Sequence, residues 1–161
     1  MGRAVERPRV LLLPGWFSDG SRKAADLRAL GYDVVCPRLS DWSFDRAVRA
    51  ARAAHDAVRP DVVVGASRGG AAALALGVGT PLVLLAPAWR WWGVRPRVAA
   101  PAAVVLHARH DRLVPFADSV NLCDSNPGVR LVAVGDDHRL NDPAARVGLR
   151  PAVRRVLRAG A

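Results

Sequence analysis

The sequence predicts an α/β protein: a three-layer sandwich with a mostly parallel sheet of about six strands. Short apolar segments rich in β-branched residues alternate with alanine-rich segments of helical character, which is the pattern of βαβ units. The apolar segments at 62–64, 82–85 and 104–106 lack polar alternation, as expected for strands buried on both faces. A length of 161 residues suits one domain, so we expect a single domain spanning residues 1–161.

The expected elements alternate along most of the chain. We expect strands at 10–13, 33–36, 61–64, 81–85, 102–107 and 130–134, each an apolar run of strand length. We expect helices at 21–30, 41–58, about 68–76, 116–123 and 141–157, in the alanine-rich and amphipathic stretches between the strands. Ser21 or Asp19 should lie near the N-terminal cap of the first helix, and Trp42 in the core or at the start of the second.

Composition excludes several classes of protein. Hydrophobic residues make up 51% of the chain and charged residues 24%, which excludes a disordered or fibrous protein. No apolar run is long enough to span a membrane, and the short charged segment 1–9 has no signal-peptide core. Cys36 and Cys123 are too few for a disulfide framework or a zinc site, so we expect a reduced, cytoplasmic setting and no metal.

The net charge of +10 comes almost entirely from arginine, since Lys23 is the one lysine. One interpretation is an anionic partner, such as nucleic acid or a membrane. The other is arginine spread over solvated helix faces in a composition set by a GC-rich genome. The arginines form no single block and do not interleave with aromatic residues, so we favour the second interpretation and expect neither nucleic acid nor membrane as a partner.

Residues able to do chemistry follow the predicted strands. In open parallel sheets, ligands bind at the carboxyl ends of the strands, so residues just after strands are the candidates for a site. Ser67, Asp111 and His138 follow three different strands, in that order along the chain. This order and placement predict a nucleophile, an orienting acid and a general base.

Ser67 lies in the pattern Gly65-x-Ser67-x-Gly69, between a predicted strand and a predicted helix. That context is typical of a nucleophile elbow, in which a side chain at either glycine would collide with neighbouring backbone. The tight turn should strain Ser67 and place its hydroxyl over the N-terminus of the next helix, where developing negative charge is stabilised. The alternative is that Ser67 is a simple helix cap.

His138 is the best candidate for the base, because it follows the last strand in a polar loop. By contrast, His55 lies in a helix, His107 lies at or within a strand end, and His110 abuts the proposed acid. The alternative for His138 is an ordinary surface histidine.

Asp111 should orient the His138 imidazole and stabilise its protonated form. The alternative for Asp111 is a loop carboxylate paired with Arg109 or Arg112. Asp136 and Asp137 are rivals for the acid that we interpret as shaping the loop around His138.

An oxyanion hole needs two backbone N–H donors. One should come from Arg68, the residue after the nucleophile. The other should come from the loop after the first strand, Pro14-Gly15-Trp16, with Trp16 as the preferred donor and Phe17 as the reserve.

These motifs resemble those of the α/β-hydrolase superfamily, in particular its small bacterial serine hydrolases without a cap domain. The resemblance covers essentially the whole chain, from Leu11-Leu12-Leu13-Pro14-Gly15-Trp16 to Gly135-Asp136-Asp137-His138, with the acid turn at His110-Asp111-Arg112-Leu113-Val114-Pro115. It implies a Ser-His-Asp triad, no cofactor, and hydrolysis of esters or related bonds through an acyl-enzyme.

The chain departs from that family in three respects. It lacks the family's two usual N-terminal strands, so the sheet should be a minimal one. Pro14 replaces the histidine that often precedes the first glycine of the oxyanion loop. The connection between the fourth and fifth strands, where other members insert a cap domain, is short, so the site should be open.

That short connection contains Trp89, Trp91 and Trp92. We predict that they form an aromatic wall for the substrate, together with Phe17. The alternatives are packing against a neighbouring helix and an exposed surface for a second copy of the chain.

The sequence is compatible with three functions. The first is a serine hydrolase that cleaves an ester or thioester of a small or medium acyl substrate. The second is an acyltransferase or tailoring enzyme acting on a chain bound to an acidic carrier protein. The third is a non-catalytic protein of this fold that binds a partner, which an intact set of Ser67, Asp111 and His138 argues against.

Overall fold

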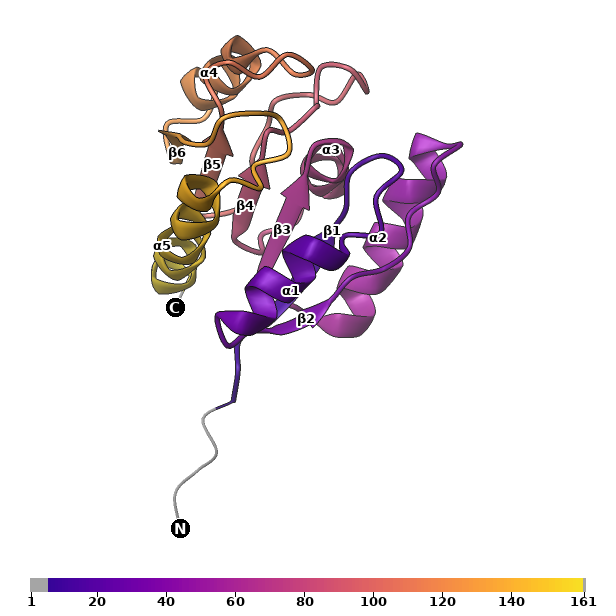
Figure 1. Ribbon diagram of the computed structural model, residues 1–161. Helices are drawn as coiled ribbons and strands as arrows, with labels where there is room; N and C mark the ends of the chain where they lie inside the picture. The colour runs from indigo at the N-terminus through magenta and orange to yellow at the C-terminus, as the bar shows by residue number, and fades with distance from the viewer. Residues whose placement is uncertain (1–5, 161) are drawn as a thin grey trace.

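The computed structural model describes residues 6–160 and confirms the predicted fold class (Figure 1). Six parallel strands form one sheet in the order β2-β1-β3-β4-β5-β6. The strands are β1 (Arg9–Leu13), β2 (Asp33–Val35), β3 (Val62–Ala66), β4 (Leu82–Leu85), β5 (Ala103–His107) and β6 (Val129–Ala133). The helices are α1 (Ser21–Ala29), α2 (Phe44–Val58), α3 (Arg68–Leu76), α4 (Phe116–Asp124) and α5 (Pro143–Ala159).

Helices cover both faces of the sheet, as Figure 1 shows. On one face, α1 and α5 bury Leu27 and Val153 against alternate residues of the central strands, such as Val64 and Val104. On the other face, α2, α3 and α4 pack against the residues in between, such as Val63. Because successive side chains of a strand point to opposite faces, an unbroken apolar run supplies both layers of core.

The helix boundaries depend on capping groups that differ in part from the prediction. Helix α2 begins at Phe44 rather than at residue 41, because the Ser43 hydroxyl caps it by accepting a hydrogen bond from the Arg46 N–H at 3.2 Å. Helix α1 has Gly20 as its N-cap residue, and Asp19 accepts a hydrogen bond from the Ser21 N–H just outside the helix. Trp42 lies just before α2 with 90% of its surface exposed, so of its two predicted positions the start of the helix is confirmed and the core is wrong.

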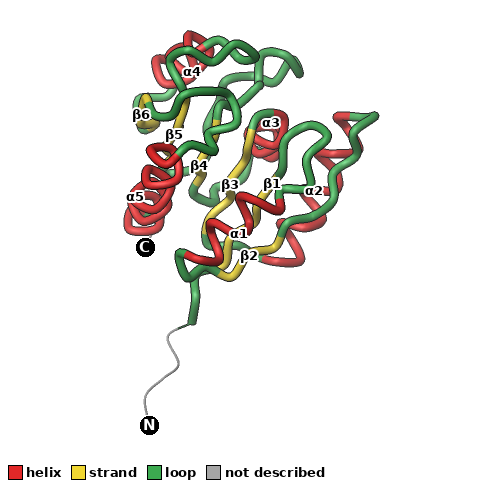
Figure 2. The backbone as a smooth tube through the Cα atoms, viewed as in Figure 1, coloured by secondary structure: helices red, strands yellow, loops and turns green. Residues whose placement is uncertain are grey.

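The loops that follow β1, β3, β5 and β6 lie along one edge of the sheet, seen at the top of Figure 2. This is where parallel strands bring their carboxyl ends together. A shallow hollow of about 980 Å³ lies at the opposite edge, among Arg9, Asp33 and Asp61 at the amino ends of strands. The candidate residues Ser67, Asp111 and His138 therefore lie at the carboxyl edge of the sheet and not in that hollow.

Within residues 6–160, no helix combines the length and the apolar character needed to cross a membrane. Residues 1–5, part of the segment in which we expected no signal-peptide core, lie outside the described residues. Cys36, just after β2, and Cys123 of α4 are both free thiols and half-buried.

Candidate active site

Ser67 lies in the sharp turn between β3 and α3. Its backbone has φ 51° and ψ −115°, a strained conformation for a residue other than glycine. A Cβ at position 65 would stand 2.7 Å from the Gly69 carbonyl oxygen, and one at 69 would stand 2.0 Å from the Leu13 carbonyl oxygen. The two glycines are therefore needed for the backbone to make this turn, as the sequence argument predicted.

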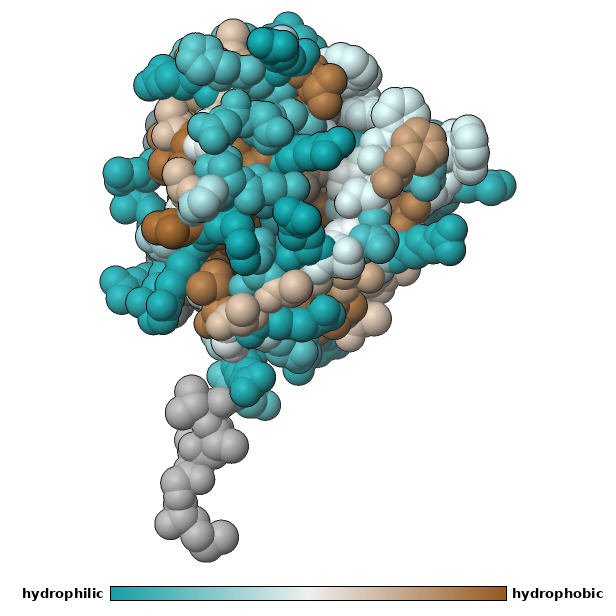
Figure 3. Space-filling view, viewed as in Figure 1, coloured by the Kyte–Doolittle hydropathy of each residue, from teal (hydrophilic) through white to brown (hydrophobic). Residues whose placement is uncertain are grey.

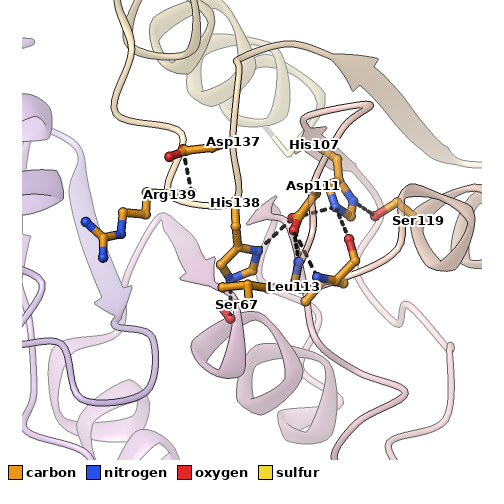
Figure 4. A network of polar contacts seen from close by, with 9 residues as sticks. Ser67, His107, Asp111, Leu113, Ser119, Asp137, His138 and Arg139 are labelled. Atoms are coloured by element: carbon orange, nitrogen blue, oxygen red, sulfur yellow. Dashed lines mark hydrogen bonds and ion pairs between the residues drawn. The ribbon is translucent and has the colours of Figure 1, made fainter.

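The side chains of Ser67, His138 and Asp111 form a continuous chain of hydrogen bonds (Figure 4). His138 Nε2 lies 2.8 Å from Ser67 Oγ, and His138 Nδ1 lies 2.7 Å from Asp111 Oδ2. The His138 side chain is 15% exposed while that of Asp111 is fully buried. Ser67 and His138 are thus partly exposed, and the carboxylate lies behind them.

The Asp111 carboxylate is held by four hydrogen-bond donors. Its Oδ1 accepts the backbone N–H groups of Leu113 and Val114 at 2.8 and 2.9 Å, and its Oδ2 accepts from His138 and His107. Burial alone would raise the pKa of Asp111, but the hydrogen bonds from Val114, His138 and Leu113 outweigh it and hold that pKa below its usual value. The carboxylate is therefore charged at neutral pH. No ion pair joins it to Arg109 or Arg112 among the described residues.

The loop that carries His138 is fixed by groups on either side of it. Asp142 caps α5 by accepting from the Ala145 N–H at 3.0 Å, and its other oxygen accepts from the Asp136 N–H at 3.1 Å. The hydrogen bond from Ala145 contributes most to lowering the pKa of Asp142. Lys23 of α1 donates to the Leu140 carbonyl oxygen. The loop is thereby held between α1 and α5.

The rival residues do not lie in this chain of hydrogen bonds. Asp136 and Asp137 are exposed, and Asp137 accepts from the backbone N–H of Arg139 at 2.9 Å (Figure 4). His55 pairs with Thr80 on the far side of α2, and His110 is exposed. The interpretation of Asp136 and Asp137 as residues that shape the loop agrees with these positions.

The loop after β1 passes close to Ser67. A Cβ at Gly15 would lie 3.5 Å from the Ser67 Cβ, so this loop is in contact with the turn. Asp41 holds it: the carboxylate accepts the Phe17 N–H at 2.9 Å, and the Asp41 carbonyl accepts the Trp16 indole N–H at 2.8 Å. The Phe17 amide is therefore engaged. The backbone N–H groups of Trp16 and Arg68 have no acceptor among residues 6–160.

The Arg68 side chain is buried beside two aromatic rings. It is 2% exposed, and its Cζ lies 4.8 Å from the Trp92 ring centroid and 5.7 Å from that of Phe44. Its Nε and Nη2 atoms are buried without a hydrogen-bond partner in the described residues. Burial lowers the pKa of Arg68, and the nearby charge of Asp41 offsets part of that effect. The guanidinium is therefore held mainly by the rings.

The three tryptophans after β4 occupy three different environments. Trp89 is buried and donates its indole N–H to the Asp118 carbonyl of α4 at 3.1 Å, which is the alternative of packing against a helix. Trp91 is 64% exposed. Trp92 packs edge-on against Trp16 at 5.5 Å between ring centroids and stacks on Phe44 at 5.1 Å. Of the three tryptophans in the predicted aromatic wall, Trp92 is the one that stacks against the loop after β1, to which Phe17 itself belongs.

Phe17 is 65% exposed and stacks on Trp16 at 5.0 Å, with the exposed Trp42 ring edge-on to it at 6.0 Å. Pale and light-brown side chains gather on this side of the molecule, at the upper right of Figure 3. An exposed aromatic rim, made of Trp16, Phe17 and Trp42, thus lies beside the turn that carries Ser67.

Sequence reasoning missed two contributors to this site. His107 was set aside because it ends a strand, yet its Nε2 lies 3.0 Å from Asp111 Oδ2. The signal available was its position directly at a strand end, the same rule that selected Ser67. Asp41 gave no comparable signal, because its role depends on a contact with residues 24 and 25 positions away.

No protein-family model and no curated protein matches the sequence. Solved structures do match over nearly the whole chain. Alpha/beta hydrolase domain-containing protein 10 from mouse superposes with a TM-score of 0.79 at 15% identity, covering 97% of this chain and 92% of that one. A structure described as a hydrolase of the alpha/beta superfamily from Xanthomonas campestris pv. campestris has a TM-score of 0.60 at 26% identity, with 96% of both chains covered.

An esterase domain from a Rhodothermus marinus protein matches with a TM-score of 0.66 at 19% identity, covering 93% of this chain and 87% of that one. The chain therefore has the α/β-hydrolase fold, which confirms the predicted resemblance at the level of the fold. Similar structures include hydrolases and an esterase domain. Sequence identity this low does not carry a substrate from one chain to another.

Proposed function

We propose that the protein is a serine hydrolase that cleaves an ester or thioester of a small or medium acyl substrate through an acyl-enzyme. The observation that supports this most strongly is the chain of hydrogen bonds from Ser67 through His138 to the buried, charged Asp111. A serine hydroxyl is a poor nucleophile until a base takes its proton, and His138 Nε2 lies within reach of that proton.

In this mechanism, Ser67 Oγ attacks the substrate carbonyl while His138 accepts the hydroxyl proton. The imidazolium that forms is stabilised by Asp111, which also fixes the ring so that Nδ1 carries a proton. His138 then protonates the leaving group, and it later activates water to release the acyl group from Ser67.

The carbonyl oxygen gains negative charge as Ser67 attacks. The backbone N–H groups of Arg68 and Trp16 are the proposed donors to it, because neither is used by another described residue. The N-terminus of α3, which begins at Arg68, adds its dipole. Removing one such donor in other enzymes costs about 10²–10³ in kcat.

The proposed substrate-binding groups are Phe17 and Trp92, which lie on or against the Trp16 loop. The buried Trp89 is better assigned to the core, and the Trp91 side chain is largely exposed to solvent. No cofactor or metal takes part in the proposed reaction.

A fluorophosphonate probe tests the proposal, because it labels only an activated serine. We expect labelling of Ser67 in the wild-type protein, located by mass spectrometry, and none in Ser67→Ala. Ser125→Ala is the matched control, since Ser125 is exposed on the far end of α4, and it should label as the wild type does. A folded wild-type protein that takes no label would overturn the mechanism and favour a non-catalytic binding role.

Panels of short- and long-chain esters and thioesters would follow a positive result. Activity that is restricted to carrier-bound thioesters and falls with added salt would favour the acyl-transfer alternative, because salt screens attraction between a basic enzyme and an acidic carrier. Activity on free esters that does not depend on salt would favour the hydrolase.

A further inference from the structure

A second histidine lies directly behind the carboxylate of the proposed triad. His107, the last residue of β5, is fully buried. Its Nε2 lies 3.0 Å from Asp111 Oδ2 and 3.1 Å from the Val114 carbonyl oxygen, and its Nδ1 lies 2.7 Å from Ser119 Oγ of α4. Figure 4 shows the ring between Asp111 and Ser119, on the side of the carboxylate away from Ser67. The proposed mechanism gives this residue no role.

The partners of His107 decide where its proton lies. Both partners of Nε2 are oxygens that only accept hydrogen bonds, so Nε2 must carry a hydrogen and donate it. Nδ1 faces a hydroxyl that can donate, so a neutral ring accepts the Ser119 proton there. Burial lowers the pKa of His107, with the charge of Asp111 offsetting it in part, so the ring is neutral at neutral pH. One tautomer satisfies every contact.

This arrangement uses the full hydrogen-bond accepting capacity of the Asp111 carboxylate. Each carboxylate oxygen can accept about two hydrogen bonds, and here each accepts two. Oδ1 is held by two backbone N–H groups, and Oδ2 is shared by His107 and His138. The carboxylate group therefore has no freedom to rotate away from His138, and its negative charge is divided between two imidazole rings.

We propose that His107 is a positioning residue that fixes Asp111 Oδ2 for His138, with Ser119 locking the His107 tautomer. The expected effect of His107 on rate rests on the proposed hydrolase function. The arrangement of His107 around Asp111 does not depend on that function. A purely structural histidine would pack and bond in the same place without changing how His138 responds to pH. The two roles therefore predict different measurements.

Three variants separate these roles. His107→Leu removes the donor to Asp111 and puts an apolar side chain of similar size in its place. His107→Gln keeps a donor, since the glutamine amide nitrogen stands the same number of bonds from Cβ as Nε2 does. Ser119→Ala removes only the group that locks the ring. His110→Gln is the matched control, because His110 is exposed on the same turn and contacts none of these groups.

We expect His107→Leu to lower kcat for 4-nitrophenyl acetate by about tenfold to a hundredfold, with KM changed less than about threefold. The acidic limb of the kcat/KM profile should move to higher pH, because Asp111 then concentrates its charge on His138. His107→Gln should recover most of the loss and return the limb toward the wild-type position. Ser119→Ala should lose about threefold, and His110→Gln should behave as the wild type.

A spectroscopic measurement tests the geometry without substrate. In the full chain labelled with ¹⁵N-histidine, the His107 ring should show the neutral form protonated at Nε2 at pH 7.5, with the signals assigned by their loss in His107→Gln. A protonated ring, or one protonated at Nδ1 alone, would overturn the inference even if Ser67 proves unreactive.

Failure of the proposed hydrolase function can be distinguished from failure of the proposed role of His107. If the fluorophosphonate labels no variant and not the wild type, the hydrolase function fails while the tautomer measurement still decides the arrangement around Asp111. If Ser67 is labelled and folded His107→Gln and His107→Leu match the wild type in kcat and in pH profile, the positioning role is wrong. Should His107→Leu not fold, Ser119→Ala and the tautomer measurement carry the test: a kcat for Ser119→Ala equal to that of the wild type, or a His107 ring protonated at Nδ1 alone, overturns the proposal.

Discussion

Gly69 lies directly against the backbone of Leu13, so the turn that carries Ser67 is packed onto the end of β1. A Cβ at position 69 would stand 2.0 Å from the Leu13 carbonyl oxygen and 2.5 Å from the Pro14 carbonyl oxygen. Both neighbours are backbone, which cannot rotate away as a side chain can. This contact sets the distance between Ser67 and the loop that carries the Trp16 amide.

Gly69→Ala should therefore destabilise the fold by about 3 kcal/mol or more, at the upper end of the cost of overpacking. Urea unfolding followed by tryptophan fluorescence measures the loss. Gly128→Ala is the matched control, since a Cβ at 128 meets nothing within 4 Å, and we expect a change of less than about 0.5 kcal/mol. Equal stability of the two variants would mean that the β1 loop moves aside at little cost.

The stability of the protein should fall as the pH drops below 6.5, the ordinary pKa of histidine, because of His107. Burial lowers the pKa of His107 in the folded state, opposed by Asp111, while the nearby His138 lowers it further. Below pH 6.5 the unfolded chain takes up a proton that the folded chain does not, so the free energy of unfolding decreases, by at most about 1.4 kcal/mol per pH unit.

His107→Gln cannot titrate, so its stability should vary less between pH 6.5 and pH 5 than that of the wild type. Urea midpoints at several pH values test this. The carboxylates with lowered pKa values, Asp111 and Asp142, contribute stability that is lost only as the pH falls below their ordinary value of 3.8, so they do not obscure this window. Parallel curves for the two proteins would show that His107 is charged in the folded state.

The part of this site that could be predicted is the part governed by the sheet. Neighbouring parallel strands end at one edge, so residues placed just after strands had to converge, and Ser67, Asp111 and His138 do lie together there. The alternation of apolar strand segments with alanine-rich helical segments likewise predicted a parallel sheet with helices on both faces. These rules depend on local spacing and on topology, both of which the sequence displays.

The remainder depends on loop paths, which local patterns do not specify. Trp42, Trp89 and Trp92 differ in exposure because the segments before α2 and after β4 turn in ways fixed by long-range contacts such as Trp89 to Asp118. His107 was missed for a different reason: its place at a strand end made it a candidate, but the partner of its ring is set only when the turn that carries Asp111 folds back on it.

Asp41 should be required for rate more than for stability, because it holds the loop after β1. Asp41→Ala removes the acceptor of the Phe17 N–H, and we expect kcat to fall about tenfold as the neighbouring Trp16 amide loses its fixed position. Asp41→Asn keeps a neutral acceptor and should lose less, since charge-assisted hydrogen bonds are about twice as strong. Steady-state kinetics with 4-nitrophenyl acetate and thermal melts measure both effects.

Asp45→Ala is the control for Asp41, as an exposed acid at the start of α2 that lies outside the loop contacts. It should leave kcat unchanged. A kcat for Asp41→Ala equal to that of Asp45→Ala would show that the loop does not need this anchor.

Trp91 and Trp92 form a natural matched pair for testing the aromatic wall. Trp92→Ala removes the ring that supports Trp16 and stacks on Phe44, so KM for an aromatic ester such as 4-nitrophenyl benzoate should rise about three- to tenfold. Trp91→Ala removes an exposed ring and should leave KM unchanged. If Trp91→Ala has the larger effect, the substrate lies over the exposed side of this segment instead.

Arg68 combines a backbone amide proposed for the oxyanion with a side chain whose charge is buried. Burying a guanidinium whose Nε and Nη2 meet no acceptor among residues 6–160 is costly, and stacking against Trp92 and Phe44 offsets only part of that cost. Arg68→Met keeps the amide and much of the packing volume but removes the charge, so we expect it to raise the free energy of unfolding by about 1 kcal/mol. Arg49→Met, on the exposed side of α2, should change the free energy of unfolding by less than about 0.5 kcal/mol.

Because Arg68→Met keeps the backbone amide, kcat should fall less than the 10²–10³ expected for loss of an oxyanion donor. Urea unfolding and kinetics on the same preparations decide the matter: a clear loss of stability in Arg68→Met would mean that the buried charge has a partner that holds the fold together.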